Sequence, residues 1–133
     1  MKSVDESWEK TQEKSFTKWV NSHLKKRDMK VENLIDDFAT GVPLFVLFEI
    51  ISGEKLGKMY NDPQSKFHKI ANLNKAVDRI NSVVESMGIK LQFSAEQIFN
   101  GEKRQTLGLV WTLILRFQIS KMTSPMVESG MLF

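Results

Sequence analysis

The stretch LGLVWTLILRFQI, residues 107–119, contains a single charged side chain, that of Arg116. Large apolar residues fall on all sides of a helix with this sequence, and a helix that is apolar all round is normally buried. We therefore expect residues 106–119 to form a central helix. The longest uncharged runs, 38–48 and 105–115, are eleven residues each, whereas a membrane-spanning helix needs about 20. No transmembrane segment is predicted.

A second apolar stretch, residues 44–51, has Glu49 as its only polar residue. Pro43 suits the first turn of a helix and Gly53 suits its end. We expect this helix, 43–52, to form the central pair with 106–119. Residues 70–87 place apolar side chains at steps of three and four before Gly88, which indicates a long amphipathic helix. Ser94 and Gln97 have the spacing of a capping box before a short helix.

The first apolar stripe contains Phe16, Val20 and Leu24 and predicts a helix that begins after Trp8. Its solvent side is mostly basic. The predicted fold is all-α, with principal helices near 14–26, 43–52, 69–87 and 106–119 and two or three short helices. Residues 121–133 lose this periodicity, so we expect a domain over 1–120 and a C-terminal tail or truncated linker over 121–133.

Composition and charge limit the function classes. The chain has 133 residues, no Cys and a net charge of +3, which indicates one domain without disulfides or Cys-ligated metals. Basic residues exceed acidic ones in segments 1–30 and 66–121, and acidic residues prevail in 31–65. This balance favours an acidic partner surface, such as a protein filament, an anionic lipid headgroup or a nucleic acid. Nucleic-acid binding is the weakest of the three, because no base-reading helix or aromatic platform is evident.

No catalytic signature is found. Residues 52–59, SGEKLGKM, have three residues between the glycines where a phosphate loop has four, and Met59 stands where that loop needs Ser or Thr. The adjacent carboxylates Asp36 and Asp37 point apart on a helix or loop. His23 and His68 have no visible partner for metal binding or catalysis. We predict no enzyme activity, no cofactor and no metal site.

Five spaced motifs carry a family resemblance: FTKWVN at 16–21, EIISG at 49–53, HKIAN at 68–72, NG at 100–101 and LGLVW at 107–111. Over about residues 8–119 the chain resembles a calponin homology (CH) domain. It is most similar to type 1, the first CH domain of the tandem actin-binding pairs in alpha-actinin-, spectrin-, filamin- and cortexillin-like crosslinkers. The resemblance implies a cytoplasmic module of a crosslinking or scaffolding protein that binds actin filaments and is located on the actin cytoskeleton.

The resemblance also implies which residues contact actin. One surface is the first helix and the other is the region 90–119, with two loop lysines beside them. Carried over by position, the candidate contacts are Gln12, Lys14, Lys18, Asn21, Lys25, Lys66, Lys69, Lys90, Gln92, Lys103 and Thr106. Trp111 is either a core residue or a packing residue for a second CH domain, which this chain does not contain.

An alternative function stays open. In this alternative, the chain is a single-CH regulatory adaptor that binds a signalling protein or an anionic phosphoinositide membrane. A solvated basic helix face is also what many soluble helices have, so the lysines alone do not decide between these functions.

Overall fold

A computed structural model describes residues 2–119, with side chains from residue 8 onward. Its elements are α1 (Lys2–Leu24), η1 (Lys25–Arg27), α2 (Leu34–Phe38), α3 (Val42–Ser52), α4 (Lys66–Ser86), α5 (Ala95–Phe99), α6 (Lys103–Ile114) and η2 (Leu115–Ile119). The described residues contain no strand, and the all-α prediction with four principal helices is confirmed. The predicted tail, 121–133, lies outside the described residues.

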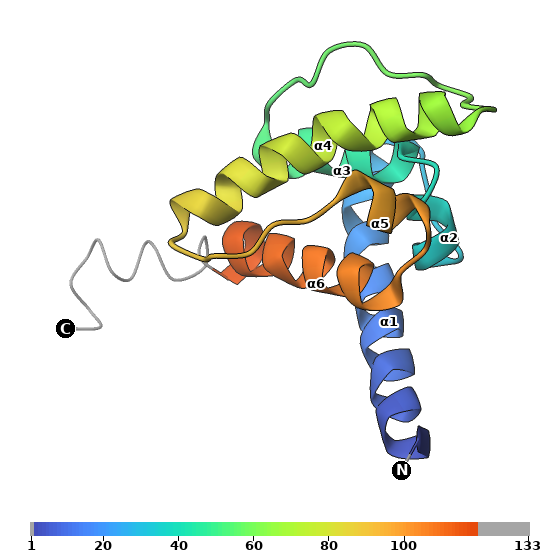
Figure 1. The fold of residues 1–133 in the computed structure, drawn as a ribbon, viewed down its shortest axis with the longest axis vertical. Helices are drawn as coiled ribbons and strands as arrows, with labels where there is room; N and C mark the ends of the chain where they lie inside the picture. Colours follow the sequence, from blue (N-terminus) through green and yellow to red (C-terminus); the bar gives the residue numbers. More distant parts are fainter. Residues whose placement is uncertain (1, 120–133) are drawn as a thin grey trace.

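The first helix is longer than the sequence predicts. It begins at Lys2 and ends at Leu24, where η1 continues for one 3₁₀ turn. Figure 1 shows the N-terminal turns of α1 projecting beyond the other helices. Glu and Lys recur in these turns and are strong helix formers, so the helix extends without an apolar stripe. The last predicted helix also begins earlier, at Lys103, and its final residues, Leu115–Ile119, are a π-helical turn.

The core lies between α1, α3, α4 and α6. α1 contributes Phe16, Val20 and Leu24 on its inner face. The two segments predicted as the central pair, 43–52 and 106–119, contribute to the same buried core, although the main packing of each is with other helices. α3 packs chiefly on α4 and α1, whereas α6 packs on α1 and α5. α1 and α2 each contact both α3 and α6, and the rings of Phe48 in α3 and Phe117 in η2 have centroids 6.1 Å apart.

Three asparagines fix the connecting segments to helices. In each case the side-chain Nδ2 donates to the backbone carbonyl of one loop residue, and Oδ1 accepts from the backbone N–H of that loop residue. The N···O distances are 2.8–3.0 Å. The pairs are Asn21 with Val31, Asn72 with Tyr60, and Asn81 with Phe93. Buried or half-buried backbone groups in irregular segments need such partners. The predicted capping box at Ser94 is not formed, since Ser94 occupies the N-cap of α5 without a side-chain cap hydrogen bond.

Candidate functional site

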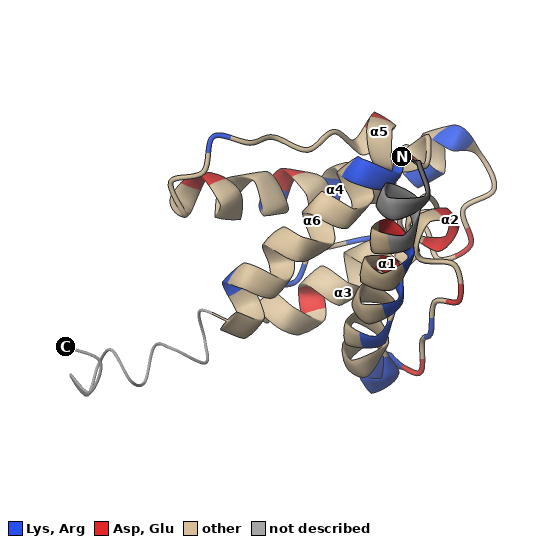
Figure 2. Ribbon diagram, turned by 90° about the horizontal axis from the view of Figure 1, so that it is seen from below, with Lys and Arg blue, Asp and Glu red and all other residues tan. Residues whose placement is uncertain are grey.

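The two sides of α1 differ in chemistry. Phe16 and Val20 face the core, whereas lysines recur along the outer side of the helix, as Figure 2 shows. Lys14 and Lys18 are both exposed, at the spacing that places them one helical turn apart. The basic stripe that the sequence predicts on this helix is therefore at the surface.

The basic stripe forms one wall of a groove, which we call the lysine groove. Lys103, at the start of α6, faces α1 across it, and its Nζ lies 3.5 Å from a carboxylate oxygen of Glu13. The groove has a volume of about 560 Å³ and is lined by Lys10, Glu13, Lys14, Thr17, Lys18, Glu32 and Lys103. Four lysines against two glutamates leave a positive surplus, which attracts an acidic surface.

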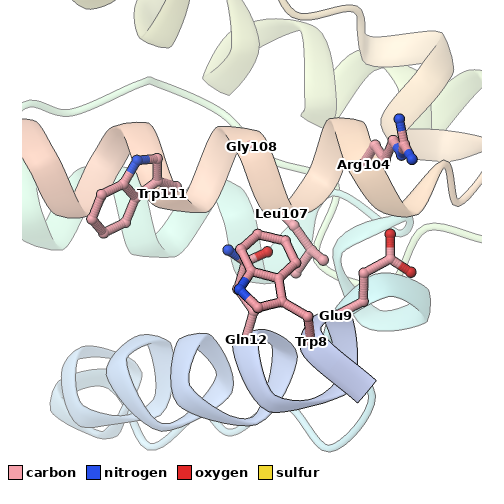
Figure 3. Close-up of a pocket in the computed structure, with 7 residues that line it drawn as sticks. All are labelled: Trp8, Glu9, Gln12, Arg104, Leu107, Gly108 and Trp111. Carbon is pink, nitrogen blue, oxygen red and sulfur yellow. The ribbon is translucent and has the colours of Figure 1, made fainter. Parts of the chain in front are cut away.

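A second groove, the tryptophan groove, lies between α1 and α6 (Figure 3). Its volume is about 380 Å³, and its lining residues are Trp8, Glu9, Gln12, Arg104, Leu107, Gly108 and Trp111. Trp8 is 63% exposed and Trp111 is 44% exposed. Trp111 stacks on Phe16 with ring centroids 6.2 Å apart. Trp111 thus contacts the core through one part of its surface and presents the rest to the groove.

Glu9 and Arg104 lie near each other at one end of the tryptophan groove, and Trp111 lies at the other end (Figure 3). Large exposed aromatic side chains with a polar rim are typical of protein contact surfaces. Arg104 and Lys103 are adjacent in sequence, yet they line different grooves. The start of α6 therefore separates the two surfaces.

The predicted residues outside these grooves are dispersed. Lys25 is exposed in η1, and Lys90 and Gln92 are exposed in the loop between α4 and α5. Lys66 is partly engaged: its Nζ lies 3.8 Å from Glu96 and 5.4 Å from the centre of a phenylalanine ring. Lys69 is half-buried on the first turn of α4.

Two predicted contact residues have other surroundings. Thr106 lies on the inner face of α6 and is fully buried. Its side chain therefore does not reach the surface. Asn21 is half-buried and both ends of its carboxamide are used by Val31. We therefore remove Thr106 from the contact set and assign a structural role to Asn21.

Lys10, Trp8 and Arg104 are among the groove residues that the sequence did not lead us to predict. Lys10 precedes Lys14 by four positions and extends the basic stripe by one turn, a signal that the spacing already contained. Trp8 and Arg104 carry no such signal. They line the same groove because α1 and α6 pack together, and a local pattern does not show that packing.

The described residues show no site for a metal. No group of three or more His, Asp or Glu among them is placed to hold an ion. No helix among residues 2–119 is both long and apolar enough to cross a membrane. What the two grooves do present is the charge of the lysines and the exposed apolar area of the tryptophans.

Comparisons with known proteins identify the fold. The calponin homology (CH) domain family matches residues 10–119. Over 117 residues, or 87% of this chain, the sequence is 50% identical to alpha-actinin of Dermatophagoides farinae, 47% identical to alpha-actinin-3 of Homo sapiens and 46% identical to alpha-actinin-1 of Homo sapiens. The match spans only 12–13% of the length of these relatives. Because the family match covers most of the chain, this chain belongs to the calponin homology domain family.

Proposed function

We propose that this chain is an actin-filament-binding module of a cytoskeletal crosslinking or scaffolding protein. The observation that carries the proposal is the lysine groove, where Lys10, Lys14, Lys18 and Lys103 gather on one side of α1. The similarity to alpha-actinins supports the choice of an actin filament as the acidic partner. Binding of this kind requires no catalysis, and we infer a cytoplasmic location on the actin cytoskeleton.

The contact begins on α1 in this proposal. Lys14 and Lys18 are exposed lysines of the groove, and neither is part of a salt bridge within the described residues. Their ammonium groups are free to meet carboxylates on a partner, and such contacts raise association rates and weaken as salt screens them. Lys103 extends the surface to α6, while Gln12 lies on the neighbouring side of α1, in the tryptophan groove.

The remaining predicted contacts lie outside the lysine groove. Lys90 and Gln92 are exposed on the loop before α5, and Lys66 and Lys69 lie at the start of α4. Lys25 continues the basic side of α1 into η1. The four lysines add positive charge at separate places outside the lysine groove, and we include all five residues as secondary contacts.

The tryptophan groove suits a different partner. Trp111 and Trp8 present apolar area that the described chain leaves uncovered, and the neighbouring Glu9 and Arg104 supply one charge of each sign. We propose that a second CH domain packs against this groove. Aromatic side chains in such a position are frequent anchors of protein interfaces.

Co-sedimentation with actin filaments at two salt concentrations tests the filament contact. The wild-type chain is expected to pellet with filaments, and less so at the higher salt concentration. Lys14→Glu/Lys18→Glu should weaken binding by tenfold or more, because it reverses two of the groove charges. The control is Lys55→Glu/Lys58→Glu, which makes the same charge change in the exposed loop before α4 and should bind nearly as the wild type does.

The outcome separates actin from other anionic partners. A chain that stays in the supernatant at about 50 μM filament, a limit near −6 kcal/mol, would argue against the proposal. Vesicles with and without phosphoinositide form the second arm of the experiment. If the chain binds only the phosphoinositide vesicles, the adaptor function replaces filament binding.

A further inference from the structure

Asn81 lies on α4 and faces the loop that joins α4 to α5. Its Oδ1 accepts a hydrogen bond from the Phe93 N–H at 2.8 Å, and its Nδ2 donates to the Phe93 carbonyl at 2.9 Å. Phe93 is only 6% exposed, so its ring is also fixed in the core. The end of the loop is therefore held by packing and by two hydrogen bonds from one side chain.

The same loop carries Lys90 and Gln92, both exposed. In Figure 1 it runs from the end of α4 back toward α5, along the side of α4 that faces α6. Among the described residues, Asn81 is the one side chain that forms hydrogen bonds to residues 89–93. Gly88, at a φ of 78°, sets the turn at the other end of the loop. Without the Asn81 carboxamide, the buried Phe93 ring and the packing of α5 on α4 would hold the far end, with no side-chain hydrogen bond to it among the described residues.

We propose that Asn81 is a positioning residue for partner binding, which holds the 88–94 loop so that Lys90 and Gln92 have a fixed geometry before contact. The inference rests on the proposed filament-binding function. Ordering a mobile loop and its side chains during binding reduces affinity, and a loop that is already ordered in the free protein avoids that loss. Asn81 thus acts on binding through two other residues and does not itself touch the partner.

The chain contains a matched control for this role. Asn72, also on α4, pairs with both backbone groups of Tyr60 at 2.9 and 3.0 Å. The two asparagines are nine positions apart, which places them on opposite sides of the helix. Asn72 therefore holds the loop of residues 53–65 in the same way, on the side away from Lys90. Its removal should affect folding without changing the presentation of the 88–94 loop.

The test is a double-mutant cycle measured by filament co-sedimentation. Asn81→Ala and Lys90→Ala/Gln92→Ala are each expected to weaken binding about three- to tenfold, which corresponds to the cost of ordering about one such side chain on binding. The combined variant should bind no more weakly than the weaker of the two, since both changes remove the same contact. Asn72→Ala combined with Lys90→Ala/Gln92→Ala should instead show the full product of its separate effects.

Urea unfolding shows that each variant is folded under the assay conditions. If Asn81→Ala does not fold, Asn81→Asp takes its place in the cycle, because it keeps the acceptor for the Phe93 N–H and loses the donor. Independent, multiplicative effects of Asn81 and the loop residues would overturn the inference, as would wild-type affinity of Asn81→Ala.

Wild-type affinity of Lys90→Ala/Gln92→Ala would also overturn the inference, because the loop would then not be a contact. The proposed function would survive that result if the wild-type chain still pellets with filaments. If the wild-type chain itself fails to pellet, the proposed function and the positioning role fall together.

Discussion

Gly41 is the position where a single added methyl group should be least tolerated. It is the N-cap of α3 with a φ of 86°, and a Cβ there would lie 2.6 Å from the Cβ of Asn72 and 2.9 Å from the carbonyl oxygen of Lys69. Both atoms belong to α4, and the carbonyl is backbone, so relief requires α3 and α4 to move apart. These two helices form a principal packing contact of the core.

Two contributions set the size of the effect of Gly41→Ala. Left-handed backbone costs an Ala residue about 1–2 kcal/mol, and overpacking a close contact costs about 1–3 kcal/mol. The free energy of unfolding should therefore fall by about 2–5 kcal/mol, out of a total of about 5–15 kcal/mol for a domain of this kind. In a domain at the low end of that range, such a change would leave a substantial unfolded fraction at 37 °C.

Gly53→Ala is the matched control at the other end of α3. Gly53 has a φ of 77°, but a Cβ there meets no atom within 4 Å. In Gly53→Ala the free energy of unfolding should therefore fall only by the backbone contribution, about 1–2 kcal/mol. Urea unfolding followed by far-UV circular dichroism gives both free energies. Equal losses in the two variants would refute the argument, because they would show that the close approach of Gly41 to α4 has no energetic consequence.

Three further predictions concern polar side chains. Glu49→Ala should lower the free energy of unfolding by about 2–4 kcal/mol, because its carboxylate is only 10% exposed, pairs with Arg27 at 2.7 Å and accepts a backbone N–H of the following loop. Arg27→Ala should lower the free energy of unfolding by less than about 1 kcal/mol, since the Arg27 side chain is 48% exposed. Urea unfolding that shows a larger loss for Arg27→Ala than for Glu49→Ala would contradict this. Asn21→Ala should lower the free energy of unfolding by about 1–3 kcal/mol, because it leaves the N–H and the carbonyl of Val31 without their partner. Unchanged stability together with reduced filament binding would instead show that Asn21 is a contact residue. Burial, and secondly the charge of Lys26, lower the pKa of His23 below 6.5. The unfolded chain therefore binds a proton at this residue more readily than the folded chain does. The free energy of unfolding should fall as the pH drops through 6.5 toward the folded-state pKa. The difference between the wild type and His23→Gln in unfolding free energy should show this dependence, and a constant difference across that range would refute it.

The apolar pattern determines how much of the fold the sequence predicts. α4 is the clearest case, because its buried residues Leu73, Val77, Ile80 and Val84 recur at steps of three and four, and the predicted range 69–87 differs little from the observed helix. The start of α1 is the opposite case. Its first turns project away from the core, so no burial periodicity marks them, and only the helix-forming tendency of the residues could have indicated their structure.

The site was predictable only as far as it is local to one helix. Lys14 and Lys18 follow from the spacing on α1, and the structure places both at the surface. Thr106 shows the limit, since a polar residue type does not reveal which face of α6 it occupies. The facing wall of the lysine groove, Lys103, is brought to α1 by the tertiary fold. Patterns within one element do not contain that packing.

The separation of the two grooves makes the two proposed contacts independently testable. Consecutive residues of an α-helix point about 100° apart, and this is why Lys103 lines one groove while Arg104 lines the other. Charge reversal at Lys14 and Lys18 leaves the lining of the tryptophan groove intact. Conversely, replacing Trp111 removes apolar area without changing the charge of the lysine groove. A partner that is sensitive to salt and to the lysines must therefore bind the first surface, whereas one that responds to Trp111 alone must bind the second.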